Sequence, residues 1–409
     1  MSSEPPAAAS APVLRRSLGL WMVTLYGLGN ILGAGIYVLV GEVAGASGYL
    51  APLAFLVSAL VAAPTALSYG ELAARYPRSA GEAVYLQQAF GRRWLSFAVG
   101  CLVATAGMVS TATLARGFAS YLTVFVEVPD WLAALVPVVG LSVLAAIGIG
   151  VAAGLAAALT FVEVAGLLVV IGGGVHGLAD LPGLVAASPT PPGVDVAAAL
   201  GAGAFLAFYA FLGFEDMVNV AEEVRRPERD LPLGIVLAMV AATVLYLLVV
   251  AVCVAAVPPA ELAQAQAPLA LVHARATGSS PLWLGALGLV AVLNGALVQT
   301  IMASRVAYGM ACEGWLPSWL ARVHPRTATP VAATAAVGAV VAVLAVGLPL
   351  GELARATSAI VLVVFALIDA ALIRVHRTVP APPGVRRLPT WVPWVGLVVS
   401  VGLLSHLAV

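Results

Sequence analysis

Three carboxyl groups lie inside long apolar stretches of this chain, where ionisable side chains are rare. Glu163 stands alone in LTFVEVAGLLVVIGG, and Glu215 and Asp216 directly follow a run of aromatic residues. Such residues are costly in an apolar segment, so they normally face a polar interior and mark an ion or substrate pathway. A carboxyl group there can carry a proton or attract a cation. For Glu163 the alternative is a structural role, as a hydrogen-bond acceptor beside unwound backbone.

The stretch GLGNILGAGIYVLVG, residues 27–41, indicates where backbone groups could bind a ligand. It carries five glycines and one asparagine inside the first apolar segment. Each glycine weakens a helix by about 1 kcal/mol relative to alanine, and unwound backbone survives in a membrane only where protein or a cavity surrounds it. We therefore predict a break at Gly33-Ala34-Gly35, whose freed N–H groups could hold a carboxylate. Close helix packing through small residues is the other interpretation.

The composition predicts the elements that must position these residues. The chain has 409 residues, of which 62% are hydrophobic and 9% charged, with a mean hydropathy of +1.05. These values predict an all-α integral membrane protein with about eleven transmembrane helices. The predicted spans are 18–40, 50–75, 94–125, 131–150, 153–175, 197–221, 231–257, 283–310, 330–348, 355–374 and 391–408. The loops at 76–93 and 311–329 are predicted to hold short amphipathic pieces at the membrane surface.

Arginine placement predicts the orientation of these spans. Arginines gather before the first span and after the second, sixth, eighth and tenth, whereas the opposite loops are mostly acidic. The positive-inside rule then places the N-terminus in the cytoplasm and the last residue outside, in a multi-pass protein of the plasma membrane. Residues 1–17 are predicted to be a disordered cytoplasmic tail, and 375–409 a cytoplasmic loop followed by one peripheral helix.

The sixth span, GAGAFLAFYAFLGFEDMVNVAEE, predicts a second interrupted helix. Gly213 lies among its aromatic residues, directly before Glu215 and Asp216. Two interrupted helices five spans apart are typical of inverted-repeat transporters, with the substrate between the breaks. In that arrangement, N–H groups near Gly33–Ile36 would take a substrate carboxylate. Carbonyl groups near Phe208–Phe211 would take an ammonium group.

Four ordered motifs resemble the amino acid–polyamine–organocation superfamily of secondary transporters. They are GLGNILGAGIYVLVG, LSYGELAARYPRSAGEAVYLQQAFG, FYAFLGFEDMVNVAEEVRRPERDLPLGI and SRVAYGMACEGWLPSWLARVHPRTATP. The resemblance implies alternating access and a five-plus-five inverted repeat with broken helices 1 and 6, in a ten-helix core at 18–374 with repeats at about 18–175 and 197–374. It implies substrate contacts at Gly33, Ala34, Gly35, Ile36, Phe208, Tyr209 and Phe211. The chain departs from the family in having eleven predicted spans where twelve are common.

Individual polar residues and one charged cluster give further expectations. Glu163 is the candidate coupling residue, at a place where many sodium-independent relatives carry a lysine and this chain has none. Asn30 and Asn294 are possible pocket residues, with helix capping or packing as their alternatives. Glu222 and Glu223 are expected to form a salt-bridge network with Arg225, Arg226 and Arg229. Asp369 is expected at a wet cytoplasmic surface.

These features predict a secondary transporter that moves amino acids, coupled to protons or by exchange. An amine or polyamine carrier of the same fold is the alternative, and a non-transporting membrane sensor is a more distant one. We expect no cofactor, no metal and no nucleic acid, because neither metal-ligand spacing nor a basic stretch is present, and no enzymatic nucleophile–base arrangement appears. The sequence gives no indication of oligomeric state.

Overall fold

A computed structural model describes residues 14–122, 128–265, 267–278, 282–347 and 350–407. Within them every regular element is a helix, and one isolated bridge joins Leu18 to Val224. The elements that match the predicted spans are α1 (Leu20–Ser47), α2 (Ala51–Arg75), α4 (Arg93–Leu122), α5 (Asp130–Ile147), α6 (Ile149–Gly174), α8 (Val196–Phe208) with η3 (Tyr209–Phe211) and η4 (Glu215–Glu223), α9 (Pro227–Ala256), α12 (Leu282–Cys312), α13 (Val331–Gly347), α14 (Leu350–Thr378) and α15 (Trp391–Leu407). The predicted all-α class is confirmed.

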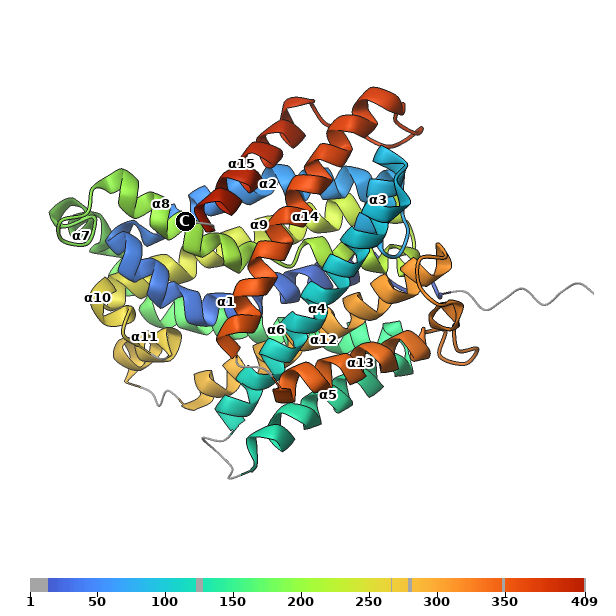
Figure 1. Cartoon of the computed structure of the whole chain (residues 1–409). Coiled ribbons are helices and arrows are strands. Elements are labelled where there is room, and N and C mark those ends of the chain that lie inside the picture. The colour runs from blue at the N-terminus through green and yellow to red at the C-terminus, as the bar shows by residue number, and fades with distance from the viewer. Residues whose placement is uncertain (1–13, 123–127, 266, 279–281, 348–349, 408–409) are drawn as a thin grey trace, which may run out of the picture.

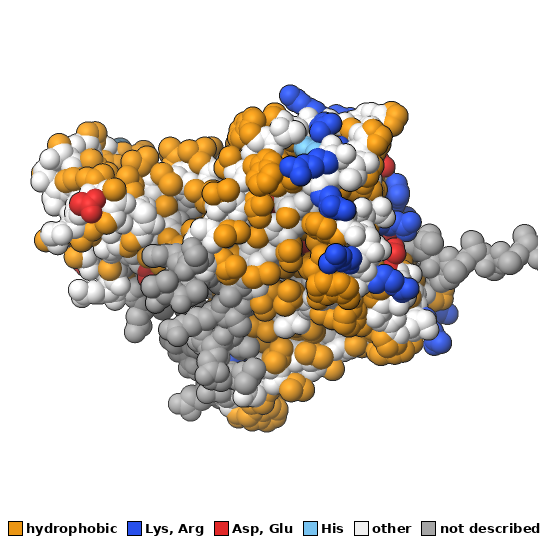
Figure 2. All heavy atoms as spheres, turned by 45° about the horizontal axis from the view of Figure 1, so that its top comes forward, with side chains coloured by type: hydrophobic (Ala, Val, Ile, Leu, Met, Phe, Trp, Pro, Cys, Tyr) orange, Lys and Arg blue, Asp and Glu red, His pale blue; other side chains and the backbone are white. Residues whose placement is uncertain are grey.

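Membrane-spanning character follows from length and hydropathy. Among the described residues, seven segments are long and apolar enough to cross a bilayer, and α5, α13 and α15 contain shorter apolar stretches. Large apolar side chains cover much of the outer surface (Figure 2). Val343 and Trp21, for example, are each 72% exposed. In water so much exposed apolar surface would drive aggregation, whereas in a bilayer it contacts lipid.

The first predicted break lies in α1. Gly33 has φ 18° and ψ −152°, which are not helical values, although helix continues on both sides. The α1 helix runs through the middle of the bundle, packed against α6, α8, α9 and α12 (Figure 1). Its backbone groups at Gly33 therefore face protein and a cavity, which is the setting that unwound backbone requires in a membrane.

The second break separates α8 and η3 from η4. Leu212 is extended, with φ −64° and ψ 145°, and Gly213 has φ 122°. A residue that has a side chain rarely adopts that φ, so glycine is required at position 213. After the break the chain continues as the 3-10 helix η4 (Glu215–Glu223). Both predicted interruptions are thus confirmed, at spans one and six.

The short helices lie outside the long spans: η1 (Gly48–Leu50), α3 (Gly81–Phe90), η2 (Val175–Ala179), α7 (Leu181–Ala187), α10 (Pro259–Leu262), α11 (Pro268–Thr277) and η5 (Ser318–Ala321). The loop at 76–93 does hold a helix, α3, but the prediction that this helix lies on the membrane surface was wrong. Most of its residues are buried, and it packs against α4, α14 and η4. Its apolar face packs against other helices of the bundle and not against lipid. Sequence periodicity shows that a helix has an apolar face but not what this face contacts.

One end of the bundle carries most of the arginines. They gather on the right of the molecule in Figure 2, whereas a carboxylate is visible at the left. We call this the arginine-rich end and define it by Arg78, Arg92, Arg225 and Arg226. Helix α3 lies at this end, beside α14 and α4 (Figure 1).

Candidate functional site

A cavity of about 320 Å³ lies between the two helix breaks. The backbone breaks supply Gly33, Gly35 and Gly213 to its wall, and α4, α12 and α14 supply most of the apolar part. The residues that line it are Asn30, Ile31, Gly33, Gly35, Tyr69, Glu82, Val103, Ala106, Gly107, Ser110, Thr113, Leu114, Tyr209, Leu212, Gly213, Glu215, Asp216, Gly295, Gln299, Met302, Ile360, Val361, Val364 and Phe365. A mostly apolar cavity with a few convergent polar groups is typical of a small-molecule site.

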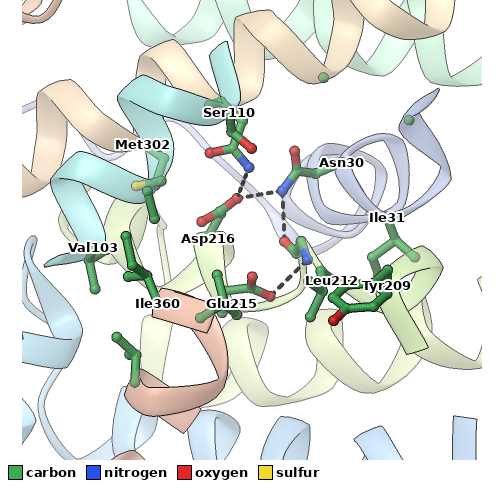
Figure 3. A pocket seen from close by; sticks show the side chains of 18 of the residues that line it. Asn30, Ile31, Val103, Ser110, Tyr209, Leu212, Glu215, Asp216, Met302 and Ile360 are labelled. Atoms are coloured by element: carbon green, nitrogen blue, oxygen red, sulfur yellow. Dashed lines mark hydrogen bonds between the residues drawn. The ribbon is translucent and has the colours of Figure 1, made fainter. Parts of the chain in front are cut away.

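A hydrogen-bonded network joins the two breaks across this cavity. The Asn30 amide nitrogen donates to Asp216 Oδ2 at 2.6 Å and to the Gly213 carbonyl at 2.9 Å. The Gln299 amide donates to the same Asp216 oxygen at 2.6 Å, and the Gly213 N–H donates to Glu215 at 2.8 Å. Figure 3 shows Asn30 between Asp216 and the second break. Asn30 therefore lies in the cavity wall and links α1 to η4.

The cavity has an acidic polar surface. Glu82, Glu215 and Asp216 all line it, and among its described lining residues there is no arginine, lysine or histidine. An unpaired buried charge is costly. Hydrogen-bond donors, protons or a cationic ligand can each offset the cost of burying these carboxyl groups.

Tyr246 of α9 contacts both broken segments from behind the cavity. Its hydroxyl oxygen lies 2.7 Å from the Ile31 carbonyl oxygen and 2.9 Å from the Ala210 carbonyl oxygen. Its ring packs edge-on against Phe211 and Phe55. Breaking two helices leaves carbonyl groups without helical partners, and the single O–H of this tyrosine lies within hydrogen-bond distance of one on each. Tyr246 leaves no signal of this role in the sequence, because it lies in an unbroken apolar span.

The predicted substrate contacts are unevenly placed around the cavity. Gly33, Gly35 and Tyr209 line it, whereas the buried Ile36 and Phe211 are not among its described lining residues. Phe208 is also buried and packs edge-on against Phe365, which does line the cavity. The side chain of Ala34 lies outside the described residues, although its backbone continues the helix after Gly33.

Glu163 and Asn294 lie together outside this cavity. The Asn294 amide nitrogen is 2.9 Å from Glu163 Oε1 and 3.0 Å from Thr160 Oγ1. Glu163 is fully buried, and its second oxygen has no hydrogen-bond partner. A methyl group at Gly29 would meet both Thr160 and Asn294, so this cluster packs directly against the first half of α1. Asn294 therefore does not face the cavity, because its amide turns towards α6.

The expected salt-bridge network below the sixth span was wrong in its partners. Glu223 pairs with Arg305 of α12, through Nη2 to Oε1 at 3.0 Å and Nε to Oε2 at 3.1 Å, and both side chains are fully buried. Arg225 and Arg226 are exposed instead. Arg305 lies 82 residues from Glu223 in the chain, on α12, and only folding brings it beneath η4.

The expectation for Asp369 was also wrong. Its side chain is fully buried, Oδ2 accepts a hydrogen bond from Thr65 at 2.8 Å, and Oδ1 has no partner. Gly396 of α15 packs directly against the carboxyl group. The helix α15 covers this position, so Asp369 lies at a helix–helix contact and not at a wet surface.

Comparison with known proteins assigns the family. The sequence model of the family described as amino acid permease matches residues 18–409. The chain belongs to this amino acid permease family. The family assignment indicates a transporter and not an enzyme, and it agrees with a multi-pass membrane protein whose small-molecule substrate is an amino acid.

Named relatives of this permease differ in substrate. It is 28% identical to the branched-chain amino acid permease BcaP of Bacillus subtilis, over 94% of this chain and 86% of the relative. It is 32% identical to the vacuolar cationic amino acid transporter 2 of Arabidopsis thaliana, over 92% of this chain and 62% of the relative. An uncharacterised transporter of Mycobacterium tuberculosis is 34% identical, over 94% of this chain and 84% of that protein.

Proposed function

We propose that this permease moves amino acids across the plasma membrane by alternating access, with the substrate held between the two helix breaks. The observation that supports this most strongly is the cavity bounded by Gly33 and Gly213, both in non-helical backbone. Ligands of transporters with discontinuous helices bind where unwound backbone exposes unpaired peptide groups. The proposed core is 18–374, with repeats at about 18–175 and 197–374 and a peripheral helix after it.

In the proposed complex, the substrate carboxylate binds N–H groups of Gly33, Ala34, Gly35 and Ile36. Its ammonium group binds backbone carbonyl groups of Phe208, Tyr209 and Phe211. Positive dipole ends at helix N-termini favour a carboxylate, and carbonyl ends favour a cation. Tyr209, which lines the cavity and packs against Phe205 and Phe208, covers the bound substrate.

Glu163 is the proposed coupling residue beside the first break. It is fully buried, one of its oxygens has no partner, and its Asn294 contact abuts α1. A proton or cation at Glu163 would neutralise this buried charge and alter the packing of α1 near Gly29. The arginine-rich end is proposed to face the cytoplasm, together with the N-terminus.

A cationic amino acid or an amine is the second candidate substrate. Three carboxyl groups line the cavity and none of its described lining residues is basic, which favours a positively charged side chain over a branched apolar one. Relatives that are named cationic amino acid transporters also favour a positively charged substrate.

Counterflow into liposomes tests both candidates. Purified protein is reconstituted in vesicles loaded with unlabelled leucine, arginine, alanine or putrescine. The same compound in labelled form is added outside, and its uptake into the vesicles is measured. We expect counterflow with at least one amino acid, and stronger counterflow with arginine than with leucine if the acidic groups set selectivity. Counterflow with putrescine alone would overturn the amino acid proposal, and counterflow with none of a full amino acid panel would overturn transport.

A further inference from the structure

Glu82 is a cavity residue that does not come from a long transmembrane helix. It lies in the first turn of α3, the short helix at the arginine-rich end, and its side chain is buried. Helix α3 is fixed to the bundle at both ends. The Gly81 N–H donates to Asn219 at 3.1 Å, and Arg374 of α14 donates to the Ala89 carbonyl at 2.6 Å. The helix thus closes the cavity at this end with a carboxyl group turned inward.

Close packing holds the entry to α3 in place. A methyl group at Gly309 of α12 would approach the Ser79 carbonyl to 2.5 Å, so the two backbones are in direct contact. Ala80 has φ 58°, a left-handed value that strains a non-glycine residue. The segment before α3 therefore stores strain that a displacement of the helix would release.

Hydrogen bonds distinguish the three carboxyl groups of the cavity. Asp216 receives two amide hydrogen bonds of 2.6 Å, and Glu215 receives a backbone one of 2.8 Å. Glu82 accepts a longer side-chain hydrogen bond from Asn219, at 3.3 Å, and one from its own backbone N–H, and its Oε2 oxygen is buried with no partner. Hydrogen bonds to a carboxylate favour its ionised form. Of the three carboxyl groups, Glu82 therefore has the longest side-chain hydrogen bond and an oxygen that is buried without a partner.

We propose that Glu82 binds a proton while α3 closes the cavity, and that loss of this proton opens the arginine-rich end. In the closed state the proton stays on the carboxyl group, because a bare carboxylate there would be buried with one of its oxygens lacking any hydrogen-bond donor. When α3 moves outward, the O–H bond breaks, the proton passes to water, and the carboxylate becomes hydrated. The inference rests on the proposed function, because it assigns a role to the cavity of the transporter.

The electrostatic surroundings agree with this assignment. The pKa of Glu82 is raised from 4.5 to about 8, mainly by burial and also by the nearby Asp216, against the opposing hydrogen bonds from its own backbone N–H and from Asn219. The titratable side chains that interact electrostatically with Glu82 are Glu215 and Asp216 of η4, Tyr69 of α2 and Tyr85 of α3 itself. The elements packed on α3 also carry Glu222 and Glu223 of η4, Arg93 of α4, and Asp369, Arg374, His376 and Arg377 of α14. Arg374 lies at the far end of α3, over the ring of Phe90.

The sign of the pH effect follows from the two states of Glu82. Its closed-state pKa lies above the ordinary value that hydration restores in the open state. The proton therefore stabilises closure fully below the ordinary pKa, and this stabilisation is lost as pH rises to about 8. Between those limits the open fraction grows by at most about tenfold per pH unit, since one proton is released.

Hydrogen–deuterium exchange of α3 tests the proposal on the purified full chain in liposomes. We expect exchange of peptides covering 81–90, corrected for intrinsic pH dependence, to rise by up to about tenfold per unit between about pH 5 and 8. In Glu82→Gln this rise should disappear, and in Glu82→Asp, which keeps a carboxyl group, it should return. Glu228→Gln is the matched control, because Glu228 is an exposed carboxylate at the same end.

Three outcomes would overturn the inference. They are a wild-type α3 whose corrected exchange does not change with pH, a Glu82→Gln variant that keeps the wild-type rise, and a loss of the rise in Glu228→Gln. Counterflow measured on the same preparations separates this result from the proposed function. A wild-type protein that exchanges amino acids while α3 is indifferent to pH contradicts the role of Glu82 and leaves amino acid transport supported.

Discussion

Replacing Gly213 by alanine should destabilise the junction of the two helix breaks. Gly213 has φ 122°, and an added Cβ would lie 2.7 Å from the Asn30 amide nitrogen and 3.0 Å from the Asn30 carbonyl carbon. The second contact is with the backbone of α1, which cannot rotate away as a side chain can. The substitution therefore strains its own backbone and pushes the two broken helices apart.

The magnitude follows from two contributions. Holding alanine in a sparsely populated backbone region costs about 1–3 kcal/mol. Displacing Asn30 weakens its hydrogen bonds to Gly213 and Asp216, at about 0.5–1.5 kcal/mol for each bond. Together we expect a loss of about 2–6 kcal/mol in the free energy of unfolding.

The assay is unfolding of the purified protein by titration of sodium dodecyl sulfate into a mild detergent, with counterflow measured in parallel. Gly201→Ala is the matched control, because Gly201 lies within helix α8 and no atom lies within 4 Å of an added Cβ. That control should be neutral or stabilising by up to about 1 kcal/mol. If Gly213→Ala unfolds and transports like the wild type, the argument that the second break requires glycine is refuted.

Two further predictions concern buried charges. Arg305→Met should lower the free energy of unfolding by about 3–5 kcal/mol, because it leaves Glu223 buried and unpaired. Adding Glu223→Gln should recover part of that loss in the same unfolding assay. Equal stabilities of the wild type and the Arg305→Met variant would contradict the pairing. Glu163→Gln should reduce the dependence of transport on pH in a pH series, because the variant cannot exchange a proton beside α1; an unchanged rate and pH dependence would remove Glu163 from the mechanism.

The local pattern of the chain determined the class of fold and the positions of the breaks. Long apolar windows can only be helices in a bilayer, because each helix satisfies its own peptide groups. Gly33 and Gly213 marked the two interruptions, because glycine tolerates backbone that other residues avoid. The predicted break at Gly33 and the unhelical Gly213 are both present in the structure.

Only the tertiary structure decided which polar groups meet. Arg305 and Glu223 are 82 residues apart, and Glu82 and Asn219 are 137 apart, so neither pair leaves a local signal. Tyr246 gave no sign of its contacts with both breaks, because its own helix is continuous and apolar. Periodicity reports the environment of one helix, whereas the partner of a buried charge depends on how several helices pack. That is why the sequence predicted a cavity between two breaks but missed the carboxyl group that α3 brings into it.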